Sequence, residues 1–214
     1  MNFKGKTAPI TTAVSGGTPI PAEPVVLLLH GYGADERDLP DLMNFLPGLP
    51  WVSPRAPEKT DFGGFAWFGI TTPLDPSESE VGEATTKLWD WIDANLPEDS
   101  PLIALGFSQG GLMATQLLRT RPQRIVGTVI IAGFIFGGEL PGDSVLKANK
   151  PKVIYCRGMQ DQMISREAVG KLNVWLQGHT RAITKSYDGL GHSIDARVMS
   201  DVAEYVEAVL LNRR

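Results

Sequence analysis

The sequence predicts an α/β protein with a mostly parallel central sheet and helices on both faces of that sheet. Short, continuous apolar runs at residues 25–29 and 102–105 are typical of strands that are buried on both sides. Between them lie segments such as 81–96, whose apolar residues recur at helical spacing. Because alternating strands and helices build parallel sheets, and 214 residues suit one core, we expect a single domain over residues 1–214.

The remaining expected elements continue this alternation. A capping box of Ser77 and Glu80 precedes the helix at 81–96, and Pro97 closes it. Ser165 can cap a later helix. Further strands are expected at 51–53, 126–132, 152–156 and 182–187, with a possible edge strand at 9–14. Further helices are expected from Asp35, from Gln109 and around 198–210.

A tight turn joins the strand at 102–105 to the helix that starts at Gln109. Its sequence, Gly106-Phe-Ser-Gln-Gly110, is the G-x-S-x-G pattern of a nucleophile elbow. Such a turn strains the serine backbone, and a side chain at either glycine would collide with the neighbouring strand or helix. The hydroxyl of Ser108 then projects from the carboxyl end of the sheet, where the helix N-terminus can stabilise an oxyanion. We therefore predict that Ser108 is a nucleophile.

Two further polar groups follow strands of the predicted sheet. Asp161 follows the strand at 152–156, and His192 follows the strand at 182–187. In open α/β sheets the site lies at the carboxyl ends of the strands. A serine hydroxyl needs a base to take its proton, and a carboxylate on the far ring nitrogen fixes the imidazole tautomer. The pattern therefore predicts a triad of Ser108, His192 and Asp161, in the chain order of elbow-type hydrolases.

Other residues of the same types are weaker candidates. His30 precedes a glycine turn and is expected to pack beneath the site. Asp188 is close to the predicted histidine in the chain, and Asp143 lies in a Gly/Pro-containing loop. Both remain open as alternatives to Asp161. Cys156 lies inside an apolar strand and is expected to be a core residue rather than a rival nucleophile.

An acyl-transfer site also needs two donors aimed at the tetrahedral oxygen. One expected donor is the backbone N–H of Gln109, the residue after the nucleophile. The other is expected from the loop after the strand at 25–29, where glycines let the backbone approach. Tyr32 is the natural donor, because its N–H lies between Gly31 and Gly33.

The composition excludes several classes of protein. A net charge of −4 without a basic cluster gives no electrostatic footprint for nucleic acid or an anionic membrane. The most apolar segment, 125–136, is too short for a bilayer, so we expect no membrane insertion. One cysteine rules out an internal disulfide, and we expect no signal peptide. These observations favour a cytoplasmic protein and leave its oligomeric state open, a homodimer included.

Several motifs together make the chain resemble one known family. They are His30-Gly-Tyr-Gly-Ala, Trp67-Phe, Gly106-Phe-Ser-Gln-Gly-Gly, Asp161 in a G-x-x-D setting, and Gly189-x-Gly-His192. From about residue 25 to its C-terminus, the chain resembles the phospholipase/carboxylesterase family of α/β-hydrolases. The resemblance implies the α/β-hydrolase fold without a large lid domain, esterase or thioesterase activity, no metal and no cofactor.

Residues near these motifs are expected to line the substrate pocket. They include Tyr32, the pair Trp67 and Phe68 in a glycine-flanked loop, and Met163 near the acid. Further candidates, for which core packing is the alternative, are Phe65, Phe134, Phe136 and Met159.

Two positions depart from the family pattern. Gly69 stands where many members carry an acidic residue, and Met-Ile-Ser at 163–165 replaces a short apolar pair plus proline. Both border the pocket, so the resemblance says less about the substrate there. The segments 69–80 and 137–150 are short and lack an apolar stripe at helical spacing, so the pocket is expected to stand largely open.

The sequence therefore predicts a serine carboxylesterase that hydrolyses small esters of short to medium acyl chain through an acyl-enzyme. An acyl thioesterase or lysophospholipase with the same triad is the alternative within this chemistry. A non-catalytic ligand-binding protein on the same fold is a third hypothesis. The presence of all three triad residues argues against it, because a binder does not need them. A small-molecule ester is the expected partner.

Overall fold

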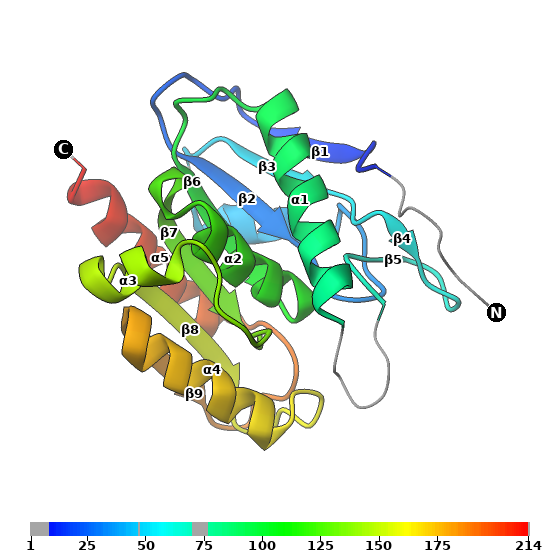
Figure 1. The fold of residues 1–214 in the computed structure, drawn as a ribbon, viewed down its shortest axis with the longest axis vertical. Helices are drawn as coiled ribbons and strands as arrows, with labels where there is room; N and C mark the ends of the chain where they lie inside the picture. The colour runs from blue at the N-terminus through cyan, green and yellow to red at the C-terminus, as the bar shows by residue number, and fades with distance from the viewer. Residues whose placement is uncertain (1–8, 47, 70–76, 214) are drawn as a thin grey trace.

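The protein is built around a seven-stranded β-sheet (Figure 1). The structure, a computed structural model, describes residues 9–46, 48–69 and 77–213. The strands lie in the order β1-β3-β2-β6-β7-β8-β9, and every neighbouring pair is parallel except β1 and β3. The mostly parallel sheet is thereby confirmed. Its strands are β1 (Ala13–Gly16), β2 (Val25–Leu29), β3 (Trp51–Pro54), β6 (Leu102–Phe107), β7 (Ile125–Ile131), β8 (Lys152–Gly158) and β9 (Arg181–Tyr187).

Helices cover both faces of the sheet, as predicted. In Figure 1 helices α1 to α4 lie in front of the sheet and α5 lies behind it. Among the described residues, no helix has the length and apolar character needed to cross a membrane. The helices are α1 (Glu78–Asn95), α2 (Gln109–Thr120), α3 (Asp143–Asn149), α4 (Arg166–His179) and α5 (Ala196–Leu211), with the short 3-10 helices η1 (Pro40–Phe45) and η2 (Pro122–Arg124).

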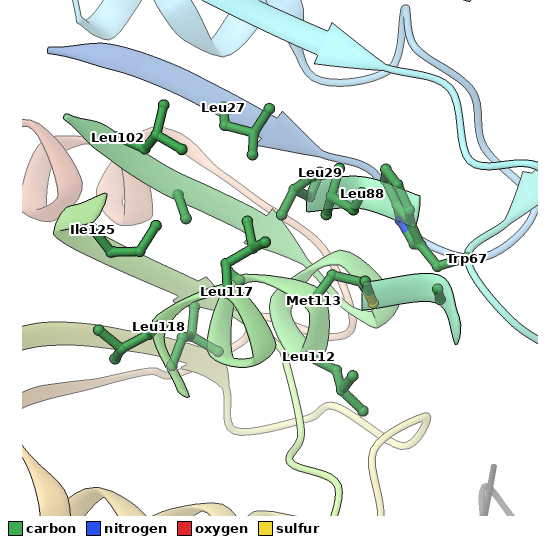
Figure 2. Close-up of a cluster of buried hydrophobic side chains, with 14 of the residues drawn as sticks. Leu27, Leu29, Trp67, Leu88, Leu102, Leu112, Met113, Leu117, Leu118 and Ile125 are labelled. Carbon is green, nitrogen blue, oxygen red and sulfur yellow. The ribbon is translucent and has the colours of Figure 1, made fainter. Parts of the chain in front are cut away.

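Side chains that alternate along each strand divide the core into two clusters. In β2, Leu27 and Leu29 pack on the side of α1 and α2, where Leu88 covers them (Figure 2). Val26 and Leu28 point to the other side and pack with residues of α5 and η1. All of β2 is fully buried. Burial on both faces explains why this strand is continuously apolar.

Some short elements differ from the sequence expectations. Strand β1 lies further along the chain than expected. The helix expected from Asp35 is instead the 3-10 helix η1, because Pro40 has no N–H to donate and so starts a helix rather than continuing one. Helix α3 and a small hairpin were not predicted, since elements this short carry no periodic pattern. The hairpin consists of β4 (Glu58–Lys59) and β5 (Phe65–Ala66).

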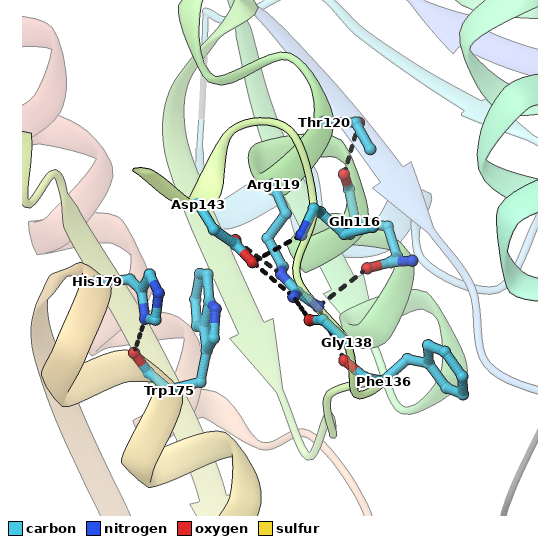
Figure 3. A network of polar contacts seen from close by, with 9 residues as sticks. Gln116, Arg119, Thr120, Phe136, Gly138, Asp143, Trp175 and His179 are labelled. Carbon is cyan, nitrogen blue, oxygen red and sulfur yellow. Dashed lines mark hydrogen bonds and ion pairs between the residues drawn. The ribbon is translucent and has the colours of Figure 1, made fainter. Parts of the chain in front are cut away.

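A buried ion pair fastens helix α2 to the segment that follows β7. The Arg119 guanidinium donates to the two carboxylate oxygens of Asp143 at 3.0 and 2.8 Å (Figure 3). It also donates to the backbone oxygens of Phe136 and Gly138. Burial is the largest single influence and would raise the pKa of Asp143, but the hydrogen bonds from Arg119 and from the Leu140 N–H, together with the positive charge of Arg119, jointly hold that pKa below its ordinary value. The Asp143 carboxylate therefore serves as a charged anchor.

Asp143→Asn is expected to lower the free energy of unfolding at neutral pH by about 3 kcal/mol, because it leaves the buried Arg119 charge without its partner. The folded pKa of Asp143 is depressed, so its stabilisation is present above the ordinary carboxyl pKa and is lost as the pH falls through the folded pKa. The stability difference between the wild-type protein and the variant should therefore shrink on acidification. Urea unfolding at a series of pH values measures this difference.

The matched control for this prediction is Asp93→Asn. Asp93 pairs with Arg121 at 2.6 Å, but the two side chains are 42% and 38% exposed. Solvent screens such a pair, so the control should lose less than about 1 kcal/mol. Equal losses for Asp93→Asn and Asp143→Asn would contradict the anchoring role.

Candidate active site

The turn between β6 and α2 has the strained geometry expected of a nucleophile elbow. Ser108 adopts φ 55° and ψ −116°, on the positive-φ side where side chains are disfavoured. A Cβ on Gly106 would overlap the carbonyl oxygen of Gly110, and a Cβ on Gly110 would overlap that of Leu29. Only glycine fits at both positions, which confirms the steric reason given for the pattern. The Ser108 N–H donates to the Ile131 oxygen at 2.9 Å and ties the elbow to β7.

Ser108, His192 and Asp161 lie in one line of hydrogen bonds. Nε2 of His192 is 2.9 Å from Oγ of Ser108, and its Nδ1 is 2.8 Å from Oδ2 of Asp161. The three residues follow the carboxyl ends of β6, β9 and β8. The structure therefore brings together the residues predicted as a triad.

Backbone groups hold the Asp161 carboxylate in place. Its side chain is 2% exposed, and Oδ1 accepts from the N–H groups of Met163 at 2.9 Å and Ile164 at 3.2 Å. These two bonds leave Oδ2 facing the histidine. The N–H of Gln160 donates to the Leu190 oxygen at 2.9 Å, which joins the acid loop to the histidine loop. The carboxylate orientation is thus set by the backbone.

His30 is fully buried and belongs to the support of the site, as expected. Its Nε2 accepts from the Ala56 N–H at 3.0 Å, so the ring proton must be on Nδ1, which donates to the Gly31 oxygen at 2.8 Å. Burial lowers the pKa of His30. The imidazole is therefore neutral at physiological pH, and both of its nitrogens are engaged.

The remaining alternatives lie away from the triad contacts. Asp143 is engaged by Arg119, and Asp188 is exposed on the surface. Cys156 is fully buried in β8, and burial raises its pKa to about 11, which suits the predicted core role. Within the described part of the chain, no cluster of three or more His, Cys, Asp or Glu side chains could hold a metal ion.

The loop after β2 brings Tyr32 close to the elbow. A Cβ on the neighbouring Gly31 would lie 3.4 Å from Cβ of Ser108, so the loop backbone touches the serine. In the described part of the chain, no hydrogen bond uses the backbone N–H of Tyr32 or of Gln109. Both N–H groups are therefore available to a ligand oxygen, and their role as oxyanion donors stays a prediction.

A second set of side chains steadies this loop and was missed by sequence reasoning. Glu36, fully buried just beyond the glycine turn, accepts from Arg55 at 2.5 and 2.6 Å, and these bonds lower the pKa of Glu36. The Arg55 guanidinium lies 4.5 Å above the centre of the Phe65 ring. The ion-pair partners are 19 residues apart, so no local pattern in the sequence could have paired them.

The structure corrects part of the expected pocket. Trp67 and Phe68 are only 1% and 2% exposed and pack in the core on the side of α1 and α2, so they do not wall an open pocket. Figure 2 shows Trp67 in this cluster. Although glycines flank their loop, large apolar side chains gain free energy by turning inward. Tyr32 and Met163 are exposed and stay pocket predictions. Residues 70–76, part of the segment expected to leave the pocket open, lie outside the described residues.

The other aromatic and methionine candidates have mixed positions. Phe134 is buried, Phe65 and Phe136 are partly buried against the core, and Met159 is exposed. For Phe134 the alternative of core packing is therefore the correct one.

Comparison with known proteins identifies the family. A family model described as phospholipase/carboxylesterase matches residues 14–210. The chain belongs to this family. It is accordingly a serine ester hydrolase, and the resemblance found in its motifs is confirmed.

Individual members of the family are distant relatives of this chain. Carboxylesterase SOBER1 of Arabidopsis thaliana is 25% identical, over 87% of this chain and 90% of the relative. Acyl-protein thioesterase 1 of Kluyveromyces lactis is also 25% identical, over 89% of this chain and 93% of the relative. The carboxylesterase structure from Bacillus cereus matches with a TM-score of 0.77 at 20% identity, covering 92% and 93% of the two chains. The structural likeness establishes the α/β-hydrolase fold, and the residues that the structure describes form no large lid domain.

Proposed function

We propose that the chain is a carboxylesterase in which Ser108 is the nucleophile, His192 the general base and Asp161 the group that orients the histidine. The unbroken line of hydrogen bonds carries this proposal, with 2.9 Å between serine and imidazole and 2.8 Å between imidazole and carboxylate. At these distances the imidazole can take the hydroxyl proton directly while the carboxylate stabilises the resulting imidazolium.

The proposed reaction proceeds through an acyl-enzyme. Oγ of Ser108 attacks the ester carbonyl carbon as Nε2 of His192 takes the hydroxyl proton, and the carbonyl oxygen becomes an oxyanion. The N–H groups of Tyr32 and Gln109 donate to this oxygen. The imidazolium then protonates the leaving alcohol, and the acyl group remains on the serine. Water repeats the attack, with His192 as its base, and releases the carboxylic acid.

Small, dissolved esters of short to medium acyl chain are the proposed substrates. Tyr32 follows β2 and Met163 follows β8, two strands on opposite sides of β6 in the sheet, and both side chains are exposed. Each methylene that such apolar surface covers contributes about 0.8 kcal/mol to binding. The gain should stop once that surface is occupied, because further carbons stay in water.

Thioester hydrolysis is the second candidate. The same attack and the same oxyanion contacts serve a thioester carbonyl, with a thiol as leaving group. The relationship to acyl-protein thioesterase 1 of Kluyveromyces lactis favours this candidate over other acyl substrates such as lysophospholipids.

Initial rates on nitrophenyl esters from acetate to palmitate, measured across the solubility limit of each, test the proposal. We expect an optimum at short to medium chains and no jump in rate when an emulsion forms, because the proposed substrates bind from solution. Thioesters of matched acyl length distinguish the two candidates by their kcat/KM values.

Several outcomes would contradict the proposal. A sharp rise in rate on emulsion formation, or a steady increase to long chains, would rule out the proposed substrate class. No turnover of any ester or thioester, with no labelling by a fluorophosphonate, would favour a non-catalytic ligand-binding protein.

A further inference from the structure

One short segment, residues 65–68, contacts the surroundings of both predicted oxyanion donors. It runs from β5 into the loop where Trp67 and Phe68 are buried. Sequence reasoning assigned this aromatic pair to the pocket wall. Because Trp67 and Phe68 are buried, the segment needs another role, and the hydrogen bonds of residues 65–68 indicate one.

On one side, the segment binds the backbone around Tyr32. The Gly33 N–H donates to the Phe65 oxygen and the Phe65 N–H donates to the Ala34 oxygen, both at 2.8 Å. The indole N–H of Trp67 donates to the His30 oxygen at 2.9 Å. These bonds hold the residues immediately after Tyr32 and the carbonyl two residues before it, so the direction of the Tyr32 N–H is constrained from both ends.

On the other side, the segment binds the side chain of Gln109. The Gln109 amide is fully buried; its Oε1 accepts from the Trp67 N–H at 2.9 Å and its Nε2 donates to the Phe68 oxygen at 2.8 Å. A buried amide is costly unless both its donor and its acceptor are paired. In Gln109 both groups are paired, with backbone atoms of the adjacent residues Trp67 and Phe68. The backbone N–H of this same glutamine is the first predicted oxyanion donor.

We propose that residues 65–68 form a bracket that sets the spacing of the two oxyanion donors, with the side chain of Gln109 as the positioning residue. The inference rests on the proposed function, because it assigns a role to groups around that site. Through these hydrogen bonds the bracket connects the loop after β2 to the start of α2, two segments that are far apart in the chain. The burial of Trp67 and Phe68 keeps it rigid.

The physical reason is the steep dependence of oxyanion stabilisation on geometry. Donors act when they are aimed in advance at the position of the developing charge. If the Gln109 side chain no longer binds the bracket, the backbone N–H groups of Tyr32 and Gln109 are no longer held at a fixed distance and orientation relative to each other. Binding of the uncharged ester should change little, whereas the transition state should lose stabilisation, so kcat should fall while KM stays close to its original value.

The first test compares two buried glutamines of helix α2. Gln109→Met keeps the length of the side chain but removes both hydrogen bonds to the bracket. We expect kcat for a short ester to fall about 10- to 100-fold with KM nearly constant. Gln116→Met is the matched control, because Gln116 is 2% exposed on the same helix and its side-chain oxygen accepts from Arg119 instead of from the bracket. It should retain kcat within about twofold.

The second test compares two adjacent glycines in the turn before the bracket. Gly63 and Gly64 both have positive φ, at 91° and 76°, so alanine strains the backbone at either position. A Cβ on Gly64 would also overlap the Gly33 carbonyl oxygen, whereas a Cβ on Gly63 meets open space. Gly64→Ala should therefore push the bracket off the Tyr32 loop and lower kcat about 10-fold, while Gly63→Ala should lower it less than about twofold.

An alkyl trifluoromethyl ketone separates positioning from general stability. Its adduct with serine carries an oxyanion, so its inhibition constant should rise in Gln109→Met and Gly64→Ala by about the factor by which kcat falls. Inhibition by the product carboxylic acid should change much less. A loss of thermal stability alone would not produce this parallel between kcat and the inhibition constant.

The proposal is overturned if Gln109→Met keeps the kcat and ketone affinity of the wild-type protein, or if Gln116→Met loses as much as Gln109→Met. If Gly64→Ala fails to fold, the glutamine pair decides alone. These failures leave the proposed function standing as long as the wild-type protein hydrolyses esters and Ser108→Ala does not. Ester hydrolysis that survives in Ser108→Ala would instead remove the proposed function itself.

Discussion

Ser108→Ala should abolish ester hydrolysis, with kcat reduced by at least about 10⁴-fold. The variant removes Oγ of Ser108, the atom that we propose forms the acyl-enzyme. Nε2 of His192, which lies 2.9 Å from this oxygen in the wild-type protein, is then left without a hydroxyl proton to take. The melting temperature should stay close to that of the wild-type protein, since the role that we propose for Ser108 is in chemistry rather than in packing. Steady-state hydrolysis of a short nitrophenyl ester and a thermal melt measure the two quantities.

Ser193→Ala is the matched control for this prediction. Ser193 is an exposed serine that directly follows His192, and its N–H donates to the Gly191 oxygen. Its removal should leave kcat within about twofold, and a fluorophosphonate should still label the protein. If Ser108→Ala keeps more than a few per cent of the wild-type hydrolysis rate, with contaminating esterases excluded, Ser108 is not the nucleophile.

Asp161→Asn should reduce kcat by about 10³- to 10⁴-fold, the second largest effect expected. Oδ1 of Asp161 accepts from two backbone N–H groups, so the oxygen of asparagine must take that position. The asparagine NH₂ group then faces Nδ1 of His192 and forces that nitrogen to act as an acceptor. The ring proton moves to Nε2 and points at Ser108, so the imidazole can no longer act as a base.

Steady-state kcat values of Asp161→Asn and of two control variants test this argument. Asp188→Asn and Asp143→Asn change the two other candidate acids, and neither should lower kcat more than about threefold. Asp143→Asn is assayed at a temperature where it remains folded. If either control lowers kcat by orders of magnitude while Asp161→Asn lowers it only slightly, Asp161 is not the acid.

Local patterns were enough to predict the layers of the fold and the three residues now seen in contact. Apolar runs mark the buried strands because both faces of a parallel sheet are covered, and helical spacing marks the helices between them. Ser108 was predictable because the elbow is a local device whose glycines and serine are consecutive in the chain. His192 and Asp161 were predictable because the carboxyl ends of parallel strands meet at one edge of the sheet.

The pocket walls and the bracket were beyond the reach of local patterns. Nothing in the sequence around Trp67 and Phe68 states whether aromatics in a glycine-flanked loop face a cleft or the core, because that depends on the space left by α1 and α2. Similarly, the partners Glu36 and Arg55 are joined by long-range packing, and no periodicity links them.

The sequence by itself therefore determined the α/β fold and the candidate chemistry, because strands, helices and the elbow are each specified within a few consecutive residues. Only the tertiary structure decided which residues hold that chemistry in register. The Gln109 side chain meets Trp67 and Phe68 more than 40 residues away along the chain. The free energy of such contacts comes from burying and pairing polar groups between segments that only the complete fold brings together.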